Sequence, residues 1–192
     1  MDFTNTENII SQFCSKLIEK ARANLNKEGK RASGTLFNQM SYDIEKTKES
    51  IKGIISFGSA EDYWIFVDQG VKGAGGFKGS GRMRGEGSKF KFTNKMPPPN
   101  IIKQWIKTKG YKGRIQKDWK NNKGAGRFIS DKSFAFLVAR SIYQRGLKRT
   151  RFITKPYEEM QRDFAEDIQQ AVTEDMNAVD NETKVELKIG KQ

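Results

Sequence analysis

The chain has 192 residues, a formal net charge of +13 and a sequence pI near 9.8, with one cysteine, Cys14, and no histidine. This composition excludes an intrachain disulfide, a Ser-His-Asp triad, a Cys-His pair and a zinc site built from histidines or several cysteines. The apolar runs are too short to cross a bilayer, and the polar start predicts no secretory signal, so we expect a reducing compartment and no membrane partner.

The first predicted element is a long amphipathic helix over residues 6–27. Apolar side chains recur there at three- and four-residue spacing, which is typical of a helix with one buried face. Thr4 or Thr6 is the expected N-cap. Cys14 falls on the apolar stripe, where we interpret it as a buried structural thiol.

Two strands are predicted next, over residues 42–46 and 51–57. Residues 61–69 form a short apolar run that is either a buried strand or one short helix, because periodicity alone does not separate the two. Residues 70–96 are rich in glycine and lysine or arginine and predict a long basic loop, a feature that usually serves a function.

The second half of the chain predicts three further helices. One begins at the prolines of 97–99 and ends at Gly110, one runs from Ser130 or Asp131 to about residue 145, and one runs over 156–178. The chain is therefore an expected α+β domain over residues 1–178, with the helices packed on one small antiparallel sheet. Residues 179–192 form a tail that is flexible or adds a strand.

The positive charge belongs to the middle of the chain. Residues 70–150 carry 21 Lys/Arg and 3 Asp/Glu, whereas residues 1–69 carry 9 and 10, and residues 151–192 carry 6 and 10. Such an excess predicts an anionic partner. The basic residues that we expect to face it are Lys72, Lys78, Arg82, Arg84, Lys89, Lys91, Lys112, Arg114, Lys117 and Lys120.

Three interpretations of this basic segment stay open. Its aromatic residues, among them Trp105, Tyr111 and Phe128, are suited to stacking on bases while the cations contact phosphates. The same cations are equally suited to docking on an acidic protein. The third interpretation is a solvated basic face around a core that contains Trp105.

Catalytic motifs fail on spacing. Gly79 and Gly81 are followed by Arg84 where a dinucleotide-binding loop needs its third glycine, and no P-loop spacing occurs. Acidic-x-Lys matches such as Asp118-Trp-Lys120 are expected by chance in a lysine-rich chain, and none follows a clear strand with a second carboxylate nearby. We therefore expect no enzymatic activity, no cofactor and no metal.

Five motifs follow one another along residues 6–175. They are Ala32-Ser-Gly34-Thr-Leu36, Tyr63-Trp-Ile-Phe-Val-Asp-Gln-Gly70, the segment from Pro97 through Trp105-Ile106 to Lys109-Gly110, Ile142-Tyr-Gln-Arg-Gly146 and Thr150-Arg-Phe152-Ile-x-x-Pro156. In this order they resemble the tail-completion or minor-tail proteins of tailed bacteriophages, which act at the neck or head–tail junction. The chain departs from the family pattern at Asp68, where glutamate is usual, at Val71, where threonine is usual, and in its longer basic loop.

The resemblance implies a non-enzymatic α+β subunit of a virion, assembled in the bacterial cytoplasm. It implies a ring of identical copies that contacts adjacent neck, portal or tail proteins. The loops 70–96 and 111–130 would line a channel for passing genomic DNA or clasp an acidic neighbouring ring. The alternative is a basic nucleic-acid-binding protein unrelated to virions. The residues that form the expected assembly and core motif are Tyr63, Phe66, Trp105 and Phe152.

Overall fold

The computed structural model of the chain describes residues 3–29, 34–47, 50–75, 83–115 and 126–189, with side chains as far as residue 178. Its elements in chain order are α1 (Thr4–Lys27), α2 (Thr35–Asn38), β1 (Ser41–Lys46), β2 (Ile51–Ser56), η1 (Gly58–Ala60), α3 (Trp64–Gln69), β3 (Val71–Lys72), α4 (Pro99–Lys109), α5 (Asp131–Arg145), β4 (Gly146–Leu147) and α6 (Thr154–Ile189). The predicted α+β class is confirmed. The strands form two separate antiparallel pairs, β1–β2 and β3–β4, where the sequence predicted one sheet.

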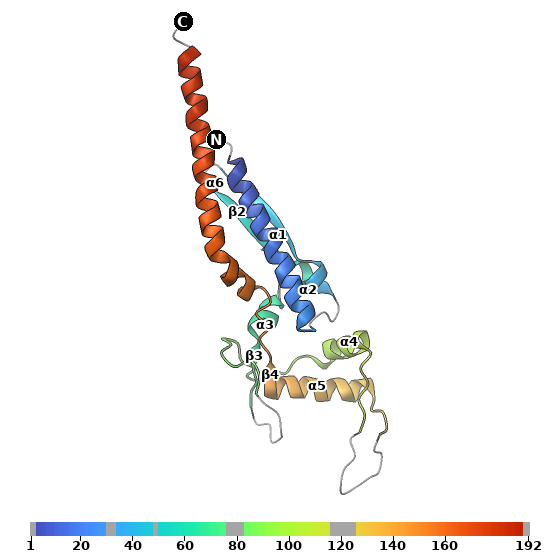
Figure 1. The fold of residues 1–192 in the computed structure, drawn as a ribbon. Helices are drawn as coiled ribbons and strands as arrows, with labels where there is room; N and C mark the ends of the chain where they lie inside the picture. The colour runs from blue at the N-terminus through green and yellow to red at the C-terminus, as the bar shows by residue number, and fades with distance from the viewer. Residues whose placement is uncertain (1–2, 30–33, 48–49, 76–82, 116–125, 190–192) are drawn as a thin grey trace.

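The long helices α1 and α6 pack along each other, and the β1–β2 hairpin covers another side of α1 (Figure 1). The ring of Phe13 on α1 lies 4.3 Å from that of Phe164 on α6, centroid to centroid. The hairpin approaches α1 closely at Gly53, where a Cβ atom would lie 2.6 Å from the sulfur of Cys14. The predicted burial of Cys14 is confirmed.

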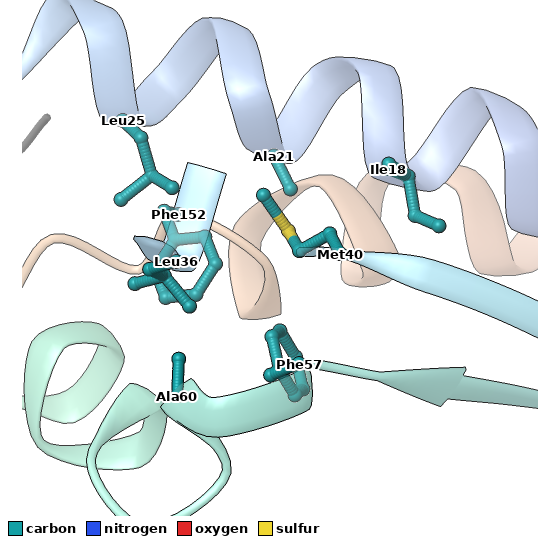
Figure 2. Close-up of a cluster of buried hydrophobic side chains, with 8 residues drawn as sticks. All are labelled: Ile18, Ala21, Leu25, Leu36, Met40, Phe57, Ala60 and Phe152. Atoms are coloured by element: carbon teal, nitrogen blue, oxygen red, sulfur yellow. The ribbon is translucent and has the colours of Figure 1, made fainter. Parts of the chain in front are cut away.

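The main hydrophobic core lies at the end of α1 next to α2 (Figure 2). Phe152, from the segment before α6, is fully buried there, and its ring meets that of Phe57 edge to face at 6.3 Å. Phe57 in turn stacks on Trp64 of α3 at 4.5 Å. Aromatic pairs of this kind add about 0.5–1.5 kcal/mol to the burial of their area. The core therefore joins α1, α2, α3 and the start of α6, and its buried residues are Ile18, Ala21, Leu25, Leu36, Met40, Phe57, Ala60 and Phe152.

Helices α4 and α5 form a separate packed pair at the other end of the molecule (Figure 1). Ile106 of α4 is buried, as are Ala135 and Ala139 of α5, which lie four residues apart on one helix face. The end of α4 and the start of α5 are those that the sequence predicts. Gly110 closes α4 in the left-handed conformation at φ 66°, and the Ser130 hydroxyl accepts the N–H of Ser133 at the start of α5.

Two local assignments that the sequence left open are settled by the fold. The run 61–69 contains the helix α3 rather than a strand. Residues 179–189 continue α6 as a helix and do not add a strand. The alternation of Val185, Leu187 and Ile189 is too short to outweigh a preceding helix that contains no glycine or proline after Pro156. No helix in the described ranges is long and apolar enough to cross a membrane.

Candidate assembly surfaces

The motif around Asp68 and the motif around Phe152 meet through one buried carboxylate. Asp68 is 0% exposed, and its Oδ1 accepts the backbone N–H groups of Ile153 at 3.1 Å and Thr154 at 3.3 Å. Its Oδ2 accepts the hydroxyl of Thr154. These donors lie at the start of α6, where N–H groups lack helical partners and the helix dipole favours negative charge. Asp68 of α3 therefore caps α6 across a separation of about 85 residues.

Backbone contacts reinforce this junction. The carbonyl oxygen of Val67 accepts the Thr150 hydroxyl at 2.7 Å, and that of Asp68 accepts the Arg151 N–H at 2.9 Å. Gly70 has φ 70°, and a Cβ atom there would lie 2.6 Å from the carbonyl oxygen of Leu147. Glycine is required at this position because both the conformation and the space exclude a side chain.

The remaining motif residues are divided between the two ends of the molecule. Leu36 lies in the same core as Phe152. Trp105 is half-buried in α4, and its ring lies 5.4 Å from that of Tyr111. Tyr63 and Phe66 are 37% and 36% exposed and are not part of the buried core, and the ring of Phe66 lies instead 4.8 Å from that of Phe90. Within the short helix α3 the inward positions are taken by Trp64, Val67 and Asp68.

Three of the predicted basic residues are brought together by close packing of backbone segments. Lys72 of β3 exchanges backbone hydrogen bonds with the segment around Lys91, and the Arg84 N–H donates to the carbonyl of Arg145 at 2.7 Å. Glycines allow this proximity: a Cβ atom at Gly85 would lie 2.2 Å from the Val71 carbonyl oxygen. The result is an open depression of about 470 Å³, lined by Lys72, Gly73, Met83, Arg84, Glu86 and Lys91.

A second basic cluster combines cations with an exposed aromatic ring. The guanidinium of Arg114 lies 4.4 Å from the ring centre of Phe128, and the ammonium of Lys112 lies 5.8 Å from it. Residues 113–115 pair with residues 126–129 in antiparallel fashion, which holds this arrangement in place. Phe128 is 58% exposed and Tyr111 50% exposed. This cluster offers both positive charge and stacking surfaces.

The two clusters lie at opposite ends of α5. The helix has 15 residues, so its ends are about 22 Å apart. The described candidates Lys72, Arg84, Lys89, Lys91, Lys112 and Arg114 are all exposed, and none forms an ion pair within the described residues. Lys89 lies outside both clusters. Lys78, Arg82, Lys117 and Lys120 lie outside the described residues.

The described residues contain neither a cluster of metal ligands nor a reactive thiol. No three acidic or cysteine side chains converge there as ligands for a metal ion. Burial raises the pKa of the Cys14 thiol, which disfavours the reactive thiolate.

A second buried carboxylate was also missed by sequence reasoning. Asp175 of α6 accepts the N–H groups of Asn5 at 3.1 Å and Thr6 at 2.8 Å, and the Thr6 hydroxyl at 2.7 Å. The cap of α1 is therefore Asp175, and neither Thr4 nor Thr6 supplies it as predicted. Burial raises the pKa of Asp175, but the hydrogen bonds outweigh this and lower it overall. The sequence did contain a sign of its burial, because Asp175 follows Phe164 and Ala171 at the spacing of the buried face of a helix.

No protein-family model, curated protein or solved structure matches this chain. The resemblance to phage tail-completion proteins rests on the motif residues themselves. The structure adds where those residues lie relative to one another.

Proposed function

We propose that the chain is a non-enzymatic structural subunit of a tailed-bacteriophage virion, where it forms a ring at the neck or tail, in head–tail connection or tail completion. The observation that carries this proposal is the junction at Asp68. The motif segments around Leu36, Asp68 and Phe152, which carry the resemblance, lie far apart in the sequence and pack on one another in the fold. This packing supports the proposal, because it joins the motif segments into one α+β body.

A ring subunit needs exposed surfaces that contact neighbouring copies, and the chain offers exposed apolar side chains and a projecting end of α6. Large apolar side chains are exposed on three different helices, α4, α5 and α6, where neighbouring copies can contact them. Helix α6 continues 14 residues beyond Asp175, which makes the last hydrogen bonds to α1 among the described side chains, and this extends α6 by about 21 Å (Figure 1). In the proposed ring, this projecting part of α6 reaches toward a neighbouring copy. The exposed apolar residues of these helices include Ile101, Phe136, Leu137, Tyr157 and Met176.

The two basic clusters supply the anionic contacts of the proposed ring. They face either passing genomic DNA or the acidic surface of a neighbouring protein, which is another copy of the chain or a neck, portal or tail protein. Their side chains form no ion pairs within the described residues, so their charge is available to such a partner.

The alternative function is nucleic-acid binding outside any virion. The exposed rings of Tyr111 and Phe128 beside Lys112 and Arg114 favour it, because bases stack on such rings while cations contact the phosphates. This alternative predicts that the purified chain binds DNA with an affinity that falls steeply as salt rises. Fluorescence anisotropy of a labelled duplex and a labelled single strand measures it directly.

The proposal is tested by deleting the gene from the viral genome and examining the particles by electron microscopy. We expect DNA-filled heads and separate tails to accumulate, and the purified chain added to that lysate to restore tailed infectious particles. Normal tailed particles from the deletion strain would contradict the proposal.

A further inference from the structure

Helix α6 carries an acidic stripe on its exposed surface. The carboxylates at 159, 163, 166 and 167 are spaced mostly by three or four residues, and the one at 174 lies about two turns after 167, so all five fall on one side of the helix. Phe164, whose ring packs on that of Phe13 in α1, lies on a different side of α6 together with the less exposed Ile168 and Ala171. The stripe covers residues 159–174 and is therefore about 22 Å long. Its members, all exposed, are Glu159, Asp163, Glu166, Asp167 and Glu174.

The stripe is only partly neutralised by its own helix. Lys155 lies 3.7 Å from Glu159 and Arg162 lies 3.6 Å from Asp163, both in exposed pairs of the kind that contribute little. The other three carboxylates form no ion pair within the described residues. The stripe therefore keeps a net negative charge.

Two basic clusters lie elsewhere on the same chain. They lie next to the two ends of α5, a helix about 22 Å long, and are together referred to as the basic face. Glu86 beside the first cluster removes only part of its positive charge. No ion pair joins this basic face to the acidic stripe within the described residues, so each has charge left for another molecule. The residues of the basic face are Lys72, Arg84, Lys91, Lys112 and Arg114.

We infer that the acidic stripe of one copy docks on the basic face of the next copy. The contact joins two different surfaces, so it adds copies in one direction and closes into a ring when the rotation between neighbours allows it. Opposite charges on the two surfaces set the orientation of the two copies and speed their encounter. The inference rests on the proposed function, since it names the partner that the basic clusters meet in the ring.

Charge reversal of each surface tests this contact in the purified full-length chain. The basic-face variant carries Lys72→Glu, Arg84→Glu and Lys91→Glu, and the stripe variant carries Glu159→Lys, Asp163→Lys and Glu166→Lys. A control variant with Lys16→Glu, Lys20→Glu and Lys52→Glu changes the net charge as much as the first variant, at exposed positions outside both surfaces. Circular dichroism checks that all three variants fold.

Sedimentation velocity then measures association at about 0.05 M and about 0.5 M salt, conditions that differ strongly in charge screening. We expect the wild type and the control to associate at low salt and to dissociate at high salt. Each reversed variant alone should associate roughly tenfold or more weakly. An equimolar mixture of the two reversed variants should associate again, because the two reversals make opposite charges face each other.

Association that survives in both variants, or a mixture that stays monomeric, would overturn the inference. A wild-type chain that stays monomeric at low salt and binds a DNA duplex would also overturn it, and would assign the basic face to nucleic acid. Failure of the proposed function is a separate result. A chain that self-associates as expected but is absent from virus particles keeps this interface and loses the virion role. A chain that is present in virus particles but does not self-associate in this way keeps the virion role and loses this interface.

Discussion

Replacement of Asp68 by alanine should destabilise the fold strongly. The change removes the acceptor of the Ile153 and Thr154 N–H groups and of the Thr154 hydroxyl, at a site with no exposure to solvent. Each buried donor left unsatisfied costs about 1–3 kcal/mol, and loss of a helix cap alone costs about 0.5–2 kcal/mol. Since these terms overlap, we expect a loss of about 3 kcal/mol in the free energy of unfolding.

Urea unfolding followed by far-UV circular dichroism measures this loss. For a slope of about 2 kcal/mol per molar urea, the midpoint should fall by about 1.5 M. Asp68→Asn keeps one acceptor oxygen and should lose about half as much. The matched control is Asp163→Ala, an exposed carboxylate on α6, which should change stability by less than about 0.5 kcal/mol. A midpoint for Asp68→Ala equal to that of the control would refute the capping role.

Three further predictions concern buried groups. The pKa of Asp175 is lowered by folding, so its contribution is present above the unfolded value of about 3.9 and is lost as the pH falls through the lower folded value. The urea midpoints of Asp175→Asn and the wild type should therefore differ at about pH 6 and converge as the pH falls below the ordinary carboxyl range. Phe152→Ala should lower the free energy of unfolding by about 3–5 kcal/mol in the same assay, because the ring is fully buried. The Cys14 thiol should react with a thiol reagent at neutral pH only after urea is added, and rapid reaction in the folded chain would contradict its burial.

The helices that carry both periodic apolar spacing and clear end signals could be predicted from the sequence. In α4 and α5 the signals were the prolines of 97–99, Gly110 and Ser130, whose local conformations act without help from the rest of the fold. The run that became α3 could not be assigned, because a short apolar segment fits a helix or a strand equally well. It forms a helix that carries Asp68, whose carboxylate reaches the start of α6.

The candidate surfaces were only partly predictable. The basic composition of residues 70–150 identified the cations, but spacing along the chain did not show that Lys72, Arg84 and Lys91 share one depression. That proximity depends on backbone hydrogen bonds between distant segments and on glycines that lack a Cβ atom. The capping roles of Asp68 and Asp175 were missed for the same reason, because their partners lie about 85 and 170 residues away.

The acidic stripe on α6 shows what a helical assignment adds to composition. In the sequence, residues 151–192 have a modest acidic excess with basic residues interspersed. Once the segment is a helix packed on α1, the carboxylates of 159–174 fall on one exposed face. Charge that is modest in total is thereby concentrated into a surface of defined length.

The central claim is that the chain is a fixed structural component of a virus particle. Quantitative mass spectrometry of purified intact particles of the proposed source virus tests this most directly, by counting the chain against the major capsid protein. We predict a constant ratio that corresponds to roughly 6 to 12 copies per particle, which fits a closed symmetric ring. Absence of the chain from intact particles would contradict the claim.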